Sequence, residues 1–358
     1  MRVAVVGLGW AGRSIWLPRL HEHPGFTVVA AVDSRPDARR AVAREGMAAT
    51  VQASADELDP RSVDLAVVAV PNHLHTAVGA ELLARGIPVF LEKPVCLTSG
   101  EADQLAEAEH RGGSVLLAGS AARYRADVRA LYGLAGELGE LRHIELSWVR
   151  ARGVPDMGGW FTRRRMSGGG ALVDLGWHLF DTIAPLLGGA RFEQVVGTVS
   201  DDFMNGGSWR ASWRQDAPVS ADEGGDVEDT ARGFLVTEDG VSVSLRASWA
   251  SHETHDVTLV RVEGSAGTAV LRCTFGFSPN RVGAATLTWT RNGEAQPVTV
   301  PDEPVGSEYL GQIDELPRML AEPGGAGRAV EEARRTIGVI ERFYASARRA
   351  PWPVTAGR

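Results

Sequence analysis

Two short segments of the chain carry side chains that could move protons. Lys93 ends an apolar run in Glu92-Lys93-Pro94, and Asp174 and His178 follow the glycine run 168–170. Because residues four apart share one face of a helix, the Asp174 carboxylate could orient the His178 ring for general acid–base chemistry. A lysine at a strand end could hold a substrate hydroxyl and stabilise a developing alkoxide. The competing interpretations are a solvated lysine and a surface i,i+4 pair.

The neighbours of this pair favour a buried site. Apolar and aromatic side chains surround Asp174 and His178, which argues against a fully solvated helix. These neighbours are Leu172, Val173, Leu175, Trp177 and Phe180. The other histidine clusters, His73/His75 and His252/His255, have no cysteine or carboxylate framework at ligand spacing. The sequence therefore predicts no metal centre.

A glycine-rich turn near the start of the chain predicts a dinucleotide site. The apolar run 3–6 leads directly into Gly7, and Gly9 and Gly12 follow at the GxGxxG spacing. In such a turn the glycines permit the bend, the approach of a pyrophosphate, and close helix packing, and the helix N-terminus attracts the phosphates. The expected cofactor contacts here are Gly7, Gly9, Trp10, Ala11 and Gly12. A plain tight strand–helix turn is the competing interpretation.

Polar residues at the ends of later apolar runs extend the predicted cofactor site. Asp33 could accept a hydrogen bond from the ribose 2′-OH, which favours NAD. Ser34 and Arg35 could accommodate a 2′-phosphate, so NADP remains possible. Ligands of parallel sheets bind at the carboxyl ends of the strands, which gives a further set of expected cofactor contacts. This set is Pro71, Asn72, His75, Glu92 and Lys93. For the cluster 71–75, a polar turn that caps the next helix is the competing interpretation.

Strand and helix signals alternate through the first third of the chain. The apolar β-rich runs are 3–6, 27–32, 63–70, 87–91 and 114–118, with helical patterns between them, such as 74–85. Alternation of this length predicts an α/β fold with a doubly wound parallel sheet. We expect residues 1–121 to form a dinucleotide-binding domain.

The pattern changes after residue 121. Strands are expected at 141–149, 193–199, 231–237, 241–249, 257–263, 268–272 and 286–291, and helices at 123–138 and within 166–187. Turn signals at 238–240 and 265–267 join several strands as hairpins, which predicts an α+β domain over 122–325 with a mostly antiparallel sheet. Apolar residues three and four apart predict an amphipathic helix over 329–347, in a C-terminal segment 326–358.

Composition and charge exclude other classes of protein. The chain has 358 residues, of which 44% are hydrophobic and 23% charged, as in a two-domain globular protein. The net charge of -8 leaves no basic stripe for a nucleic acid. No apolar stretch approaches the ~20 residues that span a membrane, and the start is not a signal peptide. The two cysteines form no CxxC. We therefore expect a cytoplasmic enzyme with a small-molecule substrate and no nucleic-acid or membrane partner.

In this order along the chain, the motifs resemble the glucose–fructose oxidoreductase / inositol dehydrogenase family of NAD(P)-dependent sugar and cyclitol oxidoreductases. The resemblance covers nearly the whole chain and rests on Gly7, Gly9, Asp33, Pro71, Asn72, His75, Glu92-Lys93-Pro94, 168–170, Asp174 and His178. It implies a Rossmann domain, with Lys93, Asp174 and His178 as catalytic residues. It also implies an open antiparallel sheet through which copies form a dimer or tetramer, and a C-terminal helix that returns to the first domain.

One position departs from the family's pattern. Members often carry an amide residue before an Arg–aromatic pair, but this chain has Ala121 before Arg123 and Tyr124. How a polar contact near the nicotinamide or the substrate is made is therefore left open. The resemblance implies that Arg123 and Tyr124 contact the substrate, together with Asp174 and His178.

The expected reaction is hydride transfer between a secondary alcohol or ketone of a sugar, aminosugar or cyclitol and the nicotinamide, with a place in aminosugar or aminoglycoside synthesis. Trp160 and Phe161 could form a platform for the sugar ring or pack in the core. The acidic segment 200–229 could attract a cationic aminosugar or be a solvated loop. Alternatives are a nucleotide-sugar ketoreductase, glycoside cleavage with recycled NAD, and a non-catalytic regulator. The basic run 163–165 could bind the diphosphate of a nucleotide sugar or be a solvated turn.

Overall fold

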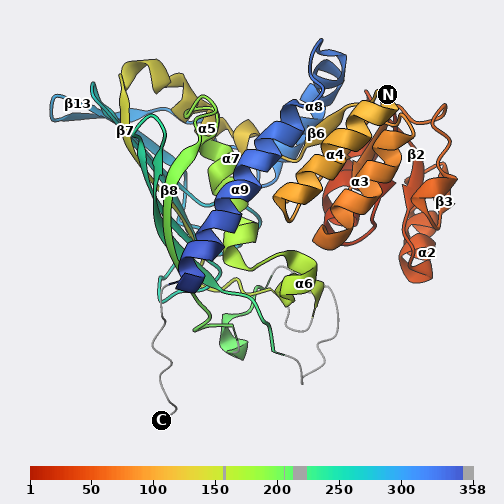
Figure 1. The fold of residues 1–358 in the computed structure, drawn as a ribbon, viewed down its shortest axis with the longest axis horizontal. Helices are drawn as coiled ribbons and strands as arrows, with labels where there is room; N and C mark the ends of the chain where they lie inside the picture. Colours follow the sequence, from red (N-terminus) through yellow and green to blue (C-terminus); the bar gives the residue numbers. More distant parts are fainter. Residues whose placement is uncertain (156–158, 205, 213–223, 350–358) are drawn as a thin grey trace.

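The computed structural model describes residues 1–155, 159–204, 206–212 and 224–349, and two β-sheets organise them (Figure 1). The first sheet is parallel, with the order β3-β2-β1-β4-β5-β6. Its strands are β1 Arg2–Val6, β2 Thr27–Val32, β3 Thr50–Gln52, β4 Leu65–Val68, β5 Val89–Leu91 and β6 Leu116–Ala118. The strand order reverses between β1 and β4, as in a doubly wound sheet. The predicted α/β fold is confirmed.

Helices cover both faces of this sheet. They are α1 Leu17–Glu22, α2 Pro36–Glu45, α3 His75–Ala84, α4 Ser99–Gly112 and α8 Ser307–Ala321. Alternate residues of β1 enter two separate cores, because successive side chains of a strand point to opposite faces. Helix α8 was not predicted from the sequence, since Pro317 within it is a helix-breaking signal. Its Ile313 and Leu316 nevertheless fill the core beside β1 and α1.

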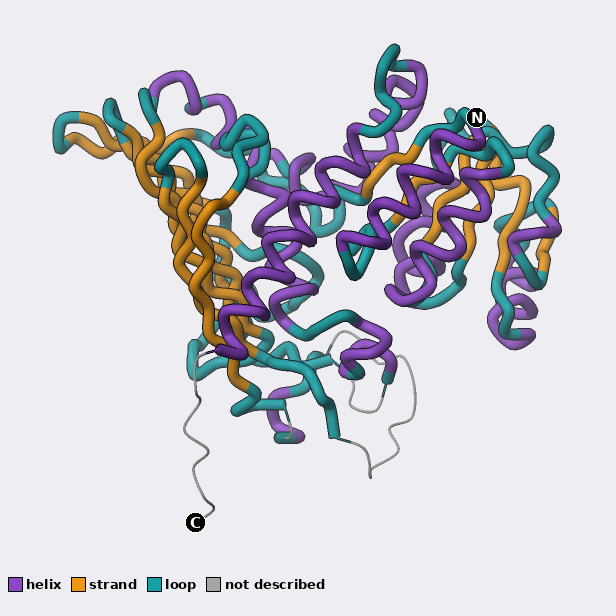
Figure 2. Tube along the Cα trace, in the orientation of Figure 1, coloured by secondary structure: helices purple, strands orange, loops and turns teal. Residues whose placement is uncertain are grey.

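The second sheet has the order β14-β13-β12-β11-β7-β10-β9-β8. Its strands are β7 Leu141–Val149, β8 Phe192–Ser200, β9 Thr230–Thr237, β10 Ser242–Ser248, β11 Val257–Gly264, β12 Thr268–Cys273, β13 Thr286–Arg291 and β14 Glu294–Val298. All neighbours are antiparallel except β10 and β7, which confirms the predicted mostly antiparallel sheet. The described helices all lie on one side of it, so its outer face, at the left of Figure 2, is open. Helices α5 Ala126–Gly133, α6 Arg164–Ser167 and α7 Trp177–Ile183 lie on the inner side.

Helix α9, Arg328–Arg349, lies between the two sheets and contacts both α4 and β8 (Figure 1). The predicted apolar stripe of this helix is buried. Phe343 is fully buried over Gly197 of β8 and Gly233 of β9, which face each other across the paired strands. A Cβ at either glycine would collide with the Phe343 ring. The two glycines therefore form the seat of α9.

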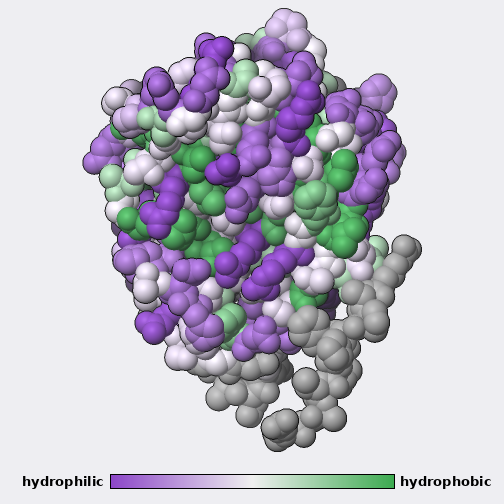
Figure 3. Space-filling model, turned by 90° about the vertical axis from the view of Figure 1, so that its left-hand side faces the viewer, coloured by the Kyte–Doolittle hydropathy of each residue, from purple (hydrophilic) through white to green (hydrophobic). Residues whose placement is uncertain are grey.

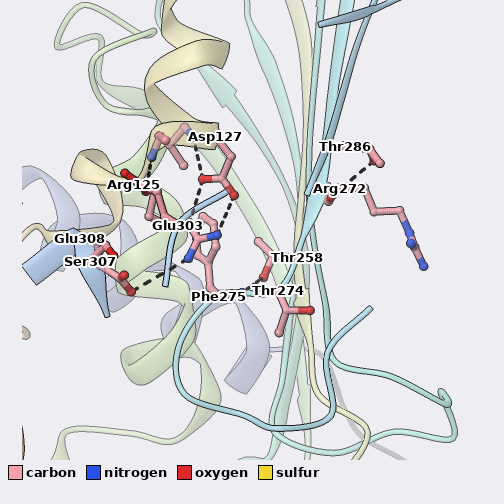
Figure 4. A network of polar contacts seen from close by, with 12 residues as sticks. Arg125, Asp127, Thr258, Arg272, Thr274, Phe275, Thr286, Glu303, Ser307 and Glu308 are labelled. Atoms are coloured by element: carbon pink, nitrogen blue, oxygen red, sulfur yellow. Dashed lines mark hydrogen bonds and ion pairs between the residues drawn. The ribbon is translucent and has the colours of Figure 1, made fainter. Parts of the chain in front are cut away.

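A buried ion pair anchors the loop that follows β12 (Figure 4). Arg125 donates two hydrogen bonds, at 2.9 and 2.6 Å, to the Asp127 carboxylate. The same guanidinium lies 4.6 Å from the centre of the Phe275 ring, and 4.0 Å from Glu308 of α8. A planar guanidinium can stack on a ring while its edge binds a carboxylate. The pair therefore holds the loop and the start of α8 together.

We expect Gly233→Ala to lower the free energy of unfolding by about 1–3 kcal/mol, because its Cβ would overpack the contact with Phe343. Gly133→Ala in α5 is the matched control, since a Cβ there meets nothing within 4 Å. That variant should be neutral or stabilising by up to about 1 kcal/mol. Urea denaturation followed by circular dichroism measures both. Equal stabilities would contradict the proposed seat of α9.

Candidate active site

A cleft of about 1120 Å³ lies at the carboxyl ends of the parallel strands, and residues from the second sheet form its opposite wall. Most of the predicted site residues line it. They are Gly7, Gly9, Trp10, Ala11, Asp33, Ser34, Arg35, Pro71, Asn72, His75, Glu92, Lys93, Trp160, Asp174 and His178. The structure therefore brings together residues that the sequence separates by more than 170 positions. Gly12 lies behind this lining, against Gly7.

The glycine turn fits a dinucleotide pyrophosphate. Gly7 has φ +96°, and a Cβ there would lie 2.6 Å from the carbonyl carbon of Ala69, so only glycine is tolerated. A Cβ at Gly12 would collide with the Gly7 carbonyl, which shows how closely the helix packs. At Gly9 a Cβ would meet nothing within 4 Å, so the backbone there is open to the cleft. The helix begins directly after Gly9, and the first N–H groups of a helix, which have no acceptor within the helix itself, can bind phosphate.

Asp33 is fixed at the end of β2. One carboxylate oxygen accepts the Leu8 backbone N–H at 2.8 Å, and the other accepts the Arg35 backbone N–H at 2.8 Å. Its side chain is only 9% exposed, whereas the Arg35 side chain beside it is 56% exposed. A ribose 2′-OH would meet the Asp33 carboxylate, and a 2′-phosphate would meet Arg35. The adenosine end of the cleft thus has a group for either cofactor.

Lys93 and Asp174 form an ion pair in the middle of the cleft. The Lys93 Nζ lies 2.7 Å from Asp174 Oδ1, with side chains 17% and 12% exposed. The Trp249 indole N–H donates to Asp174 Oδ2 at 2.9 Å, and an Arg150 nitrogen lies 3.9 Å from the same oxygen. Burial by itself raises the pKa of Asp174, but the Lys93 and Arg150 charges and these hydrogen bonds hold that pKa far below its usual range. The charged carboxylate form of Asp174 is therefore favoured.

His178 stands beside this pair as a neutral base. Its ring centroid lies 5.6 Å from that of Trp148. Burial, and then the Lys93 charge, hold the pKa of the His178 imidazole well below its usual value. Among the described contacts, Asp174 bonds to Lys93 and Trp249 and makes no hydrogen bond to the His178 ring. Asp174 was predicted to orient the His178 ring. In the structure it pairs with Lys93 instead, because an ammonium is the stronger partner of a carboxylate.

Two π-helical turns flank the neighbouring residues Glu92 and Lys93. Asp174 lies in the turn Leu172–Gly176, and Trp16 ends the turn Gly12–Trp16. The Trp16 indole N–H donates to Glu92 Oε1 at 2.8 Å, while the Lys93 backbone N–H donates to Glu92 Oε2 at 2.9 Å. Burial raises the pKa of Glu92, opposed by Lys93 and by these hydrogen bonds. π-Helical turns are frequent at functional sites, where they re-aim one side chain.

The predicted Pro71, Asn72 and His75 lie at the next strand end. The Asn72 amide donates to the Ser167 carbonyl at 3.0 Å, which links the two halves of the cleft. The His75 ring nitrogens lie 2.7 Å from the Pro94 carbonyl and 2.8 Å from the Val70 carbonyl. Burial lowers the pKa of His75 to about 4, although both carbonyl contacts oppose the shift. These side chains hold the loops in place around Lys93.

Arg123 and Tyr124 lie outside the cleft lining, in contrast to their predicted contact with substrate. Arg123 forms ion pairs with Asp181 at 2.7 Å and Glu332 at 2.9 Å, so its guanidinium links α7 to α9. The Tyr124 hydroxyl lies 3.6 Å from the Met319 sulfur. Ala121, the departing position, is buried. In this protein the side chains of Arg123 and Tyr124 make contacts within the fold.

The basic run 163–165 also lies outside the cleft lining. Arg164 contacts Glu228 at 3.5 Å, and its guanidinium lies 4.9 Å from the Tyr344 ring centre. Glu228 accepts the Gly170 and Leu172 backbone N–H groups, which shapes the glycine run. The run therefore supports the fold around the site.

The acidic segment 200–229 is partly described. Asp226 caps the Arg164 backbone N–H at 2.6 Å, and Asp229 accepts the Phe203 backbone N–H at 2.6 Å. Glu228 and Asp229 are buried, whereas Asp201, Asp202 and Asp226 are exposed to solvent. The remaining part, 205 and 213–223, lies outside the described residues.

Several residues of the site were not found from the sequence. Trp148, Arg150, Phe277 and Tyr309 line the cleft, and Trp249 holds Asp174 from behind it. Four of them come from the second sheet or its loops, which carry no motif of their own. A compositional signal was available for another residue: Lys93 is the only lysine among 37 lysine and arginine residues. A single lysine in an arginine-rich chain is a reason to consider this position as a functional candidate.

An aromatic contact closes the cleft over the glycine turn. The Phe277 centroid lies 5.2 Å from that of Trp10 and 5.8 Å from that of Tyr309. Tyr309 in turn lies 5.6 Å from Trp16. Phe277 belongs to the loop that Phe275 anchors (Figure 4). The second half of the chain thus covers the cofactor end of the cleft.

Two further observations concern membrane-spanning helices and metal sites. Within the described residues, no helix combines the length and apolar character needed to cross a membrane. In the same part of the chain, no cluster of three or more His, Cys, Asp or Glu could hold a metal ion.

A glycine turn open to phosphate, a paired lysine and a neutral imidazole in one cleft define a dinucleotide-dependent oxidoreductase. The chain belongs to the GFO/IDH/MocA oxidoreductase family. Residues 1–120 match the family model "Oxidoreductase family, NAD-binding Rossmann fold". Residues 128–270 match the "GFO/IDH/MocA C-terminal domain". The protein is an NAD(P)-dependent sugar oxidoreductase.

Three proteins are similar to this chain over most of its length. The chain is 62% identical over 347 residues, 97% of its length and 96% of the other's, to a protein of Amycolatopsis mediterranei (strain S699) named "Putative UDP-kanosamine synthase oxidoreductase subunit". It is 28% identical over 262 residues, 70% of each chain, to the D-glucoside 3-dehydrogenase of Escherichia coli (strain K12). The solved structure of GenD2 from gentamicin A biosynthesis, in complex with NAD, has a TM-score of 0.75 and 26% identity over 97% of this chain and 94% of that one.

Proposed function

We propose that this protein oxidises a secondary hydroxyl of a UDP-linked hexose with NAD, NADP being the alternative cofactor, as a step toward an amino sugar. The observation that carries the proposal is the Lys93–Asp174 pair beside the neutral His178, opposite the open glycine turn. The similarity over 97% of the chain to a protein named for UDP-kanosamine supports the substrate class. The proposal combines two expectations from the sequence, a place in an aminosugar pathway and a nucleotide-sugar substrate.

The protein's own groups bind the alcohol and move its proton. When bound, NAD(P) supplies the hydride acceptor or donor. The Lys93 ammonium donates a hydrogen bond to the reacting oxygen and stabilises the negative charge that develops there. The neutral His178 accepts the hydroxyl proton during oxidation and returns it during reduction. Asp174 keeps Lys93 aimed into the cleft.

The chemistry of amino sugars indicates why an oxidation is needed. Kanosamine is glucose with an amine in place of the 3-hydroxyl. An amine replaces a secondary hydroxyl most directly after that carbon has become a ketone, which then condenses with an amine. An oxidoreductase supplies the ketone, and a separate amine-transfer reaction consumes it. The relative named D-glucoside 3-dehydrogenase points to the same carbon. Trp160 and Phe161 in the cleft offer the sugar ring an apolar surface.

We expect Lys93→Ala, Lys93→Arg and His178→Ala to lower kcat by about 10²–10⁴-fold, because each removes a group that holds or moves the proton. Lys93→Arg retains the positive charge in a planar, longer side chain, so it tests whether a positive charge alone is sufficient or the position of the ammonium is required. NAD binding, measured by calorimetry, should stay within about threefold of wild type. Full activity in Lys93→Ala or His178→Ala would refute the assigned roles.

We expect UDP-glucose to be oxidised with NAD, measured as reduced-nicotinamide absorbance while hydroxylamine traps the ketone. Free glucose, glucosamine and myo-inositol are the comparison substrates. Since the binding energy of the nucleotide can be used for catalysis, UDP-glucose should have at least a hundredfold higher kcat/KM than glucose. Faster, salt-sensitive oxidation of a free aminosugar would overturn the proposed substrate. Turnover with no added NAD would favour the recycled-cofactor alternative.

We propose that two copies associate through the outer face of the eight-stranded sheet. Apolar patches lie among the polar residues of this face (Figure 3). Val196 is 64% exposed and Phe234 48% exposed, and they face each other on β8 and β9. Phe234→Asp should shift the mass measured by light scattering from dimer or tetramer to monomer, because a charge would be buried at the interface. Leu310→Asp, at an exposed position of α8, is the control. A monomeric wild-type protein would rule out the interface.

A further inference from the structure

The Asp174 carboxylate lies between two cations. Its Oδ1 is 2.7 Å from Lys93 Nζ, and its Oδ2 is 3.9 Å from Arg150 Nη1. The Arg150 side chain is only 13% exposed, and its guanidinium lies 5.0 Å from the Trp148 ring centre. Arginine can bind a carboxylate through two parallel hydrogen bonds, so Arg150 is a second possible partner for Asp174. A group that occupies Asp174 Oδ2 would decide which of the two cations the carboxylate pairs with.

The Trp249 indole is placed to do this. Its N–H donates to Asp174 Oδ2 at 2.9 Å, which occupies the oxygen that Arg150 would otherwise bind. The indole is fully buried, directly after β10. Its backbone N–H donates to the Asp229 carbonyl at 2.8 Å, and the Ser248 hydroxyl donates to the Ala250 carbonyl at 2.7 Å. The donor is thus held on rigid strand backbone.

We infer that Trp249 is a positioning residue, whose indole N–H holds Asp174 so that its other oxygen pairs with Lys93 and not with Arg150. This inference rests on the proposed function, in which Lys93 is the group that contacts the substrate oxygen. Trp249 itself does not line the cleft and acts through Asp174. A buried indole N–H requires an acceptor, and here the acceptor is the carboxylate that pairs with the lysine.

The test uses the fact that Lys93 is the only lysine in the chain. Acetylation by a trace of acetic anhydride at pH 7 reports its free amine directly, with the amine of Met1 as the internal reference. The Trp249→Phe variant keeps a buried ring but has no N–H. We expect Lys93 in this variant to be labelled about tenfold faster than in wild type, the factor that corresponds to one lost hydrogen bond to a charged group.

A second replacement guards against a packing defect. Trp249 exchanged for 3-benzothienylalanine keeps the bicyclic shape and replaces N–H by sulfur, so it should label Lys93 as fast as Trp249→Phe does. Adding Arg150→Gln to Trp249→Phe removes the competing cation and should return the labelling rate toward that of wild type. Trp289→Phe is the matched control, because the Trp289 indole nitrogen is buried without a hydrogen-bond partner in the described structure. Its labelling rate should equal that of wild type.

The kinetic readout separates this inference from the proposed function. For Trp249→Phe we expect kcat to fall about tenfold while the dissociation constant for NAD is unchanged. Wild-type labelling of Lys93 in both Trp249 variants overturns the inference, whatever the turnover. Faster labelling with full turnover overturns it as well, since Lys93 would then be displaced without consequence. Full activity of Lys93→Ala overturns the proposed function itself.

Discussion

The ion pair between Lys93 and Asp174 is the constraint on which the candidate active site depends. Both side chains are largely withdrawn from water, and an unpaired charge in such a position costs several kcal/mol. Lys93 follows β5 of the parallel sheet, whereas Asp174 precedes α7 on the inner side of the second sheet. Water can solvate both charges before the two halves of the molecule meet, and once the halves have met each charge is tolerable because it is paired with the other. Assembly of the fold and assembly of the site are therefore one event.

The surrounding structure holds this pair from several directions. Trp16 and Trp249 each donate an indole N–H to a carboxylate, one to Glu92 and the other to Asp174. Asn72 ties the first half of the cleft to the second through the Ser167 carbonyl. Helix α9 contacts elements of both sheets over the glycine seat. Preorganised donors of this kind need no rearrangement when charge develops, which is how a site stabilises a transition state.

The sequence predicted the parts of this arrangement that are local. The glycine turn, the alternating elements and the Asp174/His178 spacing are patterns within short windows, and each places its residues in the cleft. The partner of Asp174 could not be predicted that way. A helical i,i+4 spacing suggests His178, whereas the π-helical turn and a lysine 81 positions away decide otherwise. Trp249 and Phe277 lie on a strand end and a loop of ordinary composition, so only the tertiary fold reveals them. Arg123 shows the reverse, because a motif residue is used for an ion pair between helices.

The geometry of the site explains why the basic residue of the pair is a lysine and not another arginine. Every other basic side chain among the 37 lysine and arginine residues is an arginine, so the composition strongly favours guanidinium groups. A guanidinium at this position would bind both Asp174 oxygens and release the Trp249 indole. An ammonium uses one carboxylate oxygen, leaves the other to Trp249, and keeps N–H donors for a substrate oxygen. The geometry therefore requires a compact cation such as an ammonium. The only lysine of the chain lies in the cleft where this requirement holds.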